Sequence, residues 1–162
     1  MILTPTEFLG IGLPVSEDID QNEIAAAITV IEEVMVKPRL GDENLNTLEE
    51  YNALPAQDQD PTSQNYILIN GGLIQSGGIK RYAGLKKAIA YLTFGYMMSN
   101  TFRITRYATV EKNSEYSSSA RQDMAFQSRT NWEIGEVFLK EIVDFYELEW
   151  DCSSPNILNI LF

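Results

Sequence analysis

The sequence predicts a mainly α-helical fold: a small helical domain with a long C-terminal helix, a small β-hairpin and an extended C-terminal tail. In three long stretches, apolar residues recur every three or four positions, which is the spacing of one helix face. Two Gly-Gly pairs divide a short apolar stretch, which is typical of a tight hairpin. The final residues are mostly large and apolar, which indicates a segment that must dock.

Length and composition support one domain. Of 162 residues, 44% are apolar and 22% are charged, a globular composition with enough apolar residues for a core. We expect the helical domain to span residues 1–151 and a docking tail to span 152–162. No signal peptide is evident, and no apolar run reaches the roughly 20 residues of a membrane span. We therefore expect a soluble protein of a reducing cytosol, without membrane contact.

Composition disfavours an enzyme. The chain has no histidine and one cysteine, Cys152, so imidazole bases, Ser–His or Cys–His pairs and thiolate zinc sites are excluded. The acid pairs Glu32-Glu33 and Glu49-Glu50 are the remaining acid–base or Mg²⁺ candidates, but helix neighbours point about 100° apart and do not converge. We expect no catalytic residue, metal or cofactor. Three tyrosines are expected to be core or interface aromatics rather than catalytic phenols: Tyr51, Tyr82 and Tyr91.

The first helix is predicted over residues 20–36. Asp20 followed by Glu23 resembles a capping box, and Lys37-Pro38 is expected to end the helix because the residue before proline disfavours the α region. One apolar stripe follows the cap: Ile24, Ala27, Ile28, Ile31, Val34 and Met35. A shorter helix is predicted around 43–53.

A small β element is predicted near residues 66–82. Either Gly-Gly pair supplies the positive φ angles of a hairpin turn, and we favour Gly77-Gly78 at the tip, with Ile74 and Ile79 paired. A phosphate-binding loop is disfavoured because no Gly-Lys-Ser/Thr follows.

Two further helices are predicted, over 85–100 and over about 119–148. The apolar girth of the first implies burial on several sides. Between them, residues 101–110 are rich in β-branched and aromatic residues, which predicts an extended arm or edge strand. The longer helix is polar in its first half, so it either projects from the core as a shared surface or lies across its own domain.

Charge is distributed unevenly. The net charge is −11, yet residues 61–110 contain no acid and six bases, whereas residues 1–60 contain thirteen acids and two bases. The acidity disfavours a generic DNA-binding module. The basic block either folds against the acidic ends of its own chain or meets the acidic face of an identical subunit in a head-to-tail contact, which closes into a ring when the rotation allows.

The order of elements resembles that of head–tail connector proteins of tailed phages (adaptor, head-completion or neck-ring proteins), particularly the ring protein of crAss-like phages of gut Bacteroidetes. The resemblance lies in the capped first helix ending in Lys37-Pro38-Arg39-Leu40-Gly41, in the Gly71-Gly72 segment leading into 84–91, and in 107–117 with the following long helix. It covers about residues 20 to 148.

The resemblance implies a small helical virion protein that forms a homo-oligomeric, usually dodecameric, ring beneath the portal protein. Such a ring extends the DNA channel and offers a platform to further neck or tail proteins. Genomic DNA passes through without specific binding, and surplus carboxylates suit such a conduit because they do not grip phosphates. The implied location is the neck of the virion, after assembly in the host cytoplasm.

We expect the subunit or portal interface to use the basic block and the apolar tail: Lys80, Arg81, Lys86, Lys87, Arg103, Arg106, Ile157, Leu158, Ile160, Leu161 and Phe162. Burial of the tail and the cost of ordering it nearly balance, so we expect it to anchor on a neighbouring subunit or the portal. The alternative function is an acidic cytosolic adaptor or DNA mimic that inhibits a host enzyme, which the acidic residues 1–60 suggest.

Overall fold

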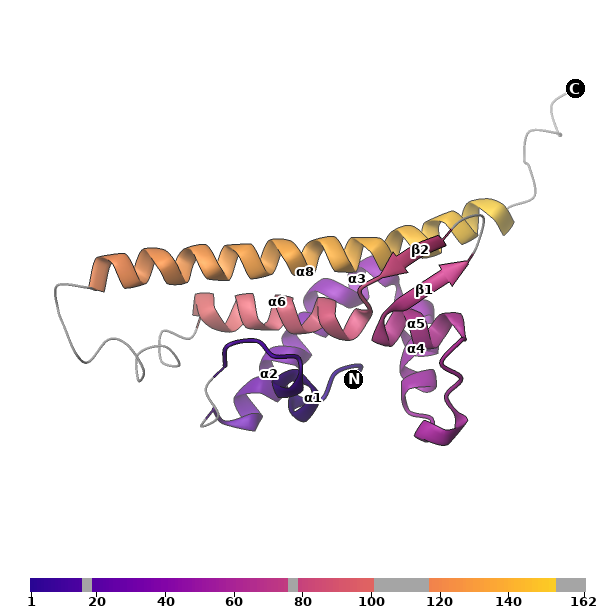
Figure 1. Ribbon diagram of the computed structural model, residues 1–162, viewed down its shortest axis with the longest axis horizontal. Helices are drawn as coiled ribbons and strands as arrows, with labels where there is room; N and C mark the ends of the chain where they lie inside the picture. The colour runs from indigo at the N-terminus through magenta and orange to yellow at the C-terminus, as the bar shows by residue number, and fades with distance from the viewer. Residues whose placement is uncertain (16–18, 76–78, 101–116, 154–162) are drawn as a thin grey trace, which may run out of the picture.

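Two long antiparallel helices dominate the fold (Figure 1). The structure is a computed structural model that describes residues 1–15, 19–75, 79–100 and 117–153. The helices are α6 (Leu85–Asn100) and α8 (Ser117–Ser153), and shorter N-terminal helices pack on the other side of α6. The predicted fold class, mainly helical with a small hairpin and a long C-terminal helix, is confirmed. The predicted arm at 101–110 and the apolar tail residues 157–162 lie outside the described residues.

Helices α6 and α8 touch at backbone distance, and two glycines make this possible. A Cβ atom on Gly95 of α6 would lie 3.0 Å from the carbonyl oxygen of Ser128, and one on Gly135 of α8 would lie 2.9 Å from the backbone nitrogen of Leu92. The buried hydroxyl of Ser128 donates a hydrogen bond to the carbonyl oxygen of Gly95 at 2.8 Å. The two helices therefore form one closely packed pair, the α6–α8 rod, which several of the shorter elements contact.

The N-terminal region begins with a helix that the sequence analysis missed, α1 (Pro5–Gly10). Its capping box pairs the side chains and backbone N–H groups of Thr4 and Glu7, a spacing visible in the sequence. Asp20 caps the next helix, α2 (Gln21–Ile31), as predicted, but its carboxylate accepts the N–H of Asn22 rather than that of Glu23, so the predicted capping box is not formed as expected. Most of the predicted stripe is buried: Ile24, Ala27, Ile28 and Ile31.

The predicted end of this helix at Lys37-Pro38 is wrong. The chain continues through a π-helical turn, η1 (Glu32–Val36), into α3 (Lys37–Leu40). In this turn the N–H of Lys37 bonds to the carbonyl oxygen of Glu32, five residues earlier, so Pro38 falls in the first turn of α3, where a missing N–H costs little. Val34, predicted in the buried stripe, is 62% exposed, whereas Glu32 is buried.

Between residues 42 and 70 the structure confirms one predicted helix and replaces part of a predicted strand by another helix. Helix α4 (Asp42–Asn52) matches the prediction for 43–53, and the short 3₁₀ turn η2 (Ala56–Asp58) follows it. The β element predicted from residue 66 is wrong over its first part, where α5 (Gln64–Asn70) forms a helix capped by the Ser63 hydroxyl. A short apolar run such as Ile67-Leu68-Ile69 is compatible with a buried helix or a buried strand, so periodicity alone does not separate them.

The hairpin itself is shorter than predicted and shifted by one residue. Strands β1 (Gly72–Gln75) and β2 (Ile79–Tyr82) pair antiparallel, with Gln75 opposite Ile79 and Ile74 opposite Lys80. The predicted Ile74–Ile79 pair is therefore wrong, because Ile74 faces the core with Tyr82 while Ile79 faces solvent. The predicted tip, Gly77-Gly78, lies outside the described residues.

The core centres on α6, as predicted from the apolar residues on several sides of this helix. Ala88, Ile89, Ala90 and Leu92 are fully buried, although they point in different directions around the helix. Helix α8, predicted over about 119–148, is longer, and its 37 residues extend for about 55 Å at 1.5 Å per residue. Its start projects beyond the end of α6 (Figure 1). Among its described side chains, the fully or almost fully buried apolar ones lie in the second half: Leu139, Ile142 and Phe145.

Candidate subunit interface

The β-hairpin presents one face to the core and one to solvent. Alternation along the strands places Leu73, Gln75, Ile79 and Arg81 on the solvent side, and we call these four residues the hairpin face. Leu73 is 56% exposed and Ile79 is 74% exposed. In the register Leu73 lies opposite Arg81, so the face combines apolar side chains with a cation. Such a surface is chemically suited to a partner that offers apolar contact beside an acid.

The predicted basic interface residues have different environments. Lys80 and Arg81 are exposed on β2, and the Lys80 ammonium lies 5.0 Å from the ring centroid of Tyr82, a cation–π contact. Lys87 is exposed on α6. Within the described part of the chain, neither Arg81 nor Lys87 has an acidic partner. The remaining predicted residues lie outside the described residues: Arg103, Arg106, Ile157, Leu158, Ile160, Leu161 and Phe162.

Lys86 serves the fold of its own chain. Its ammonium lies 2.7 Å from Glu7 Oε1 and joins the start of α6 to α1. Burial raises the pKa of the Glu7 carboxyl, but hydrogen bonds from Lys86 and Thr4 outweigh this and hold the pKa below its ordinary value. At this position the basic block does fold against the acidic end of its own chain. Lys86 is therefore a poor candidate for contact with a neighbour.

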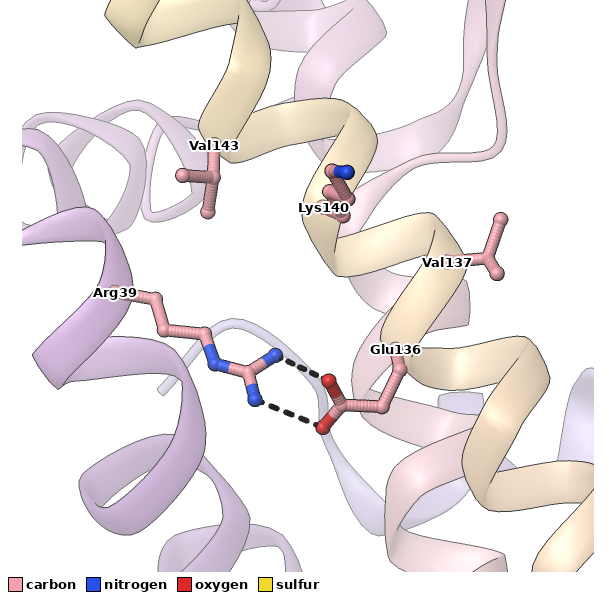
Figure 2. Close-up of a pocket in the computed structure, with 5 residues that line it drawn as sticks. All are labelled: Arg39, Glu136, Val137, Lys140 and Val143. Carbon is pink, nitrogen blue, oxygen red and sulfur yellow. Dashed lines mark hydrogen bonds and ion pairs between the residues drawn. The ribbon is translucent and has the colours of Figure 1, made fainter.

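A groove of about 340 Å³ lies between α3 and α8 (Figure 2). Arg39 of α3 reaches across it and forms a two-pronged ion pair with Glu136 of α8, with Nη1–Oε2 and Nη2–Oε1 distances of 2.6 and 3.0 Å. Val137 and Val143 supply apolar walls, and Lys140 adds a cation that has no acidic partner among the described residues. The groove can hold an apolar segment that carries a carboxylate.

This ion pair joins residues 97 positions apart, so no local pattern in the sequence pointed to it. The ion pair gives Arg39 a structural role. Arg39 belongs to the segment Lys37-Pro38-Arg39-Leu40-Gly41, which carries part of the resemblance to phage connector proteins. Bidentate Arg–carboxylate pairs combine fixed geometry with charge, and this one fixes α3 against the rod. The groove behind it was missed by sequence analysis for the same reason.

Glu32 is the one buried carboxylate among the described residues. Its Oε1 accepts the N–H of Ile2 at 2.7 Å and that of Leu3 at 3.4 Å, which ties the N-terminal segment to the π-helical turn. Burial raises the pKa of this carboxyl, while the two N–H groups and the N-terminal ammonium partly offset the rise. Glu32 is thus a structural anchor for the fully buried side chains of Ile2 and Leu3.

The acid pairs considered as catalytic groups do not converge. Glu32 is buried while the Glu33 side chain is 64% exposed, and Glu49 contacts the Met1 ammonium while Glu50 is exposed. In the part of the chain that is described, no group of three His, Cys, Asp or Glu residues is arranged to hold a metal ion. No described helix is both long and apolar enough to cross a membrane. The three tyrosines act as packing groups; Tyr91, for example, meets Phe138 edge to face at 5.7 Å.

No family model matches the chain, and no curated protein and no solved structure matches it either. The likeness to phage connector proteins therefore rests on the residues of this chain alone.

Proposed function

We propose that this protein is a structural virion component that forms an oligomeric ring at the neck of a tailed phage, joins the portal to the tail and extends the DNA channel. The observation that carries the proposal is the hairpin face, an apolar surface beside Arg81, which has no acidic partner among the described residues. A monomer that worked alone would leave this surface in water, whereas a ring subunit covers it.

The α6–α8 rod also supports an architectural role. Its glycine contacts hold the helices at backbone distance, which gives a stiff element of the kind that a ring needs to keep its shape. Phe126, in the first half of α8, is 71% exposed. This part of the rod offers a second surface for the portal or for the next neck protein.

The alternative, an acidic mimic of DNA, is less well supported by the acids of residues 1–60. A mimic needs its carboxylates free and spread over one surface. Several acids here have other tasks: Glu7 pairs with Lys86, Asp20 caps α2, Glu32 is buried and Asp42 pairs with Lys37. These acids are better explained by the fold than by imitation of phosphates.

The proposal is tested by measuring the mass of the purified protein, alone and mixed with the portal protein of the same phage, by analytical ultracentrifugation. We expect a ring-sized complex with the portal, and weaker association between copies at high salt because exposed pairs are screened beyond about 8–10 Å. A protein that stays monomeric and ignores the portal contradicts the proposal. Competition with duplex DNA for a host nuclease instead supports the mimic.

A further inference from the structure

Besides the hairpin face, the solvent side of α2 and η1 also exposes a pair of apolar side chains. Val30 is 37% exposed and Val34 is 62% exposed. Helical spacing places them on one side with Glu23, Ala26 and Glu33, all of them exposed, and we call these five residues the α2 face. The apolar centre of this face is thus flanked by carboxylates at both ends.

The α2 face and the hairpin face are complementary. Each has two exposed apolar side chains, and the cation of the hairpin face matches the carboxylates of the α2 face. Lys37 reaches Glu33 at 3.8 Å but lies closer to Asp42, at 3.4 Å, and Asp42 is the main cause of the raised pKa of Lys37. The Glu33 carboxylate is therefore only weakly engaged by its own chain.

We propose that the hairpin face of one copy docks on the α2 face of the next copy, so that the apolar pairs meet and Arg81 pairs with Glu33. This inference rests on the proposed function, because it specifies how the copies in the ring contact one another. The occupant of the hairpin face is thus a second copy of this chain. It is favoured by the charge complementarity between the two faces and by the apolar pair that each of them exposes.

The two faces lie on different parts of the molecule. In Figure 1 α2 lies below α6, whereas the hairpin lies at the other end of the bundle beside the C-terminal half of α8. A contact between two different surfaces is heterologous, so each copy has both a donor face and an acceptor face. Repetition of such a contact builds a closed ring or an open helix, whereas a two-fold contact stops at a dimer.

A charge exchange tests the contact, with the portal present as the assembly partner. The variants are Arg81→Glu and Glu33→Lys, and assembly is measured by sedimentation velocity. Each variant alone places like charges opposite each other at every contact. We therefore expect each variant to need at least a tenfold higher protein concentration than the wild type to assemble. An equimolar mixture restores opposite charges at every contact of an alternating ring, so we expect the mixture to assemble like the wild type.

The matched control is Glu50→Lys, which makes the same change in charge as Glu33→Lys at an exposed acid of α4, outside both faces. We expect this control to assemble normally. Single variants that assemble like the wild type, or a mixture that fails to recover, overturn the contact. If the contact is overturned while the wild type still forms a ring on the portal, the proposed function stands; if the wild type binds no portal, the function itself fails.

Discussion

Replacing Gly135 by alanine tests whether α6 and α8 are held at backbone contact. The new Cβ atom would lie 2.7 Å from Leu92 Cγ and 2.9 Å from Leu92 N, whereas ordinary contact begins at 3.4 Å. The helices must therefore separate by about half an ångström. Because one of the clashing atoms belongs to the backbone and cannot rotate away, the cost lies in the upper part of the usual range for overpacking, about 2–3 kcal/mol. Alanine regains about 1 kcal/mol of helix propensity. We expect a net loss of about 1–2 kcal/mol in the free energy of unfolding.

The assay is urea unfolding followed by far-UV circular dichroism, together with thermal unfolding. For a chain of this size the loss lowers Tm by about 2–8 °C. The matched control is Gly10→Ala at the end of α1, where no atom lies within 4 Å of the new Cβ. We expect that control to equal or slightly exceed the wild type in stability. A Gly135→Ala protein as stable as the wild type would refute the close-contact argument.

Three further predictions concern other parts of the chain. Burial raises the pKa of Glu32, so protonation of this carboxyl stabilises the folded state. Its contribution to the free energy of unfolding is complete below the ordinary carboxyl pKa and is lost as pH rises through the folded-state pKa. The stability of Glu32→Gln relative to wild type should therefore improve from acidic to neutral pH; parallel urea-unfolding curves of stability against pH would contradict this. Lys86→Met should destabilise the monomer by up to about 1 kcal/mol and raise the pKa of Glu7 in an NMR titration, and an unchanged Glu7 pKa would contradict the ion pair. Deletion of residues 153–162 should leave the Tm of the monomer nearly unchanged while weakening assembly, and a truncated monomer that unfolds would show that the tail belongs to its own core.

The parts of the fold that were predictable are those with long, uninterrupted periodicity. The apolar stripe of residues 85–100 gave the bounds of α6 correctly, because sixteen residues of helical spacing have no competing interpretation. Two errors came from short segments. The run Ile67-Leu68-Ile69 suits a buried strand as well as a buried helix, and the hairpin register depends on which strand residues meet the core, which only tertiary packing decides.

The error at Pro38 has a different origin. The rule that proline ends a helix assumes regular α geometry, and the π-helical turn before it removes the conflict. The candidate interface was partly predictable, since the basic block contains Arg81, but the sequence could not separate Arg81 from Lys86, which pairs with Glu7 seventy-nine positions away. Long-range pairs of this kind, like Arg39 with Glu136, depend on how the elements pack.

We propose that copies of this protein form a ring beneath a portal, and a low-resolution electron micrograph of the complex tests this proposal most directly. The portal of the same phage is imaged end-on and side-on, with and without saturating amounts of this protein. We expect an additional ring of density on the tail side of the portal, coaxial with its channel. Portal particles that look the same with and without the protein would contradict the claim.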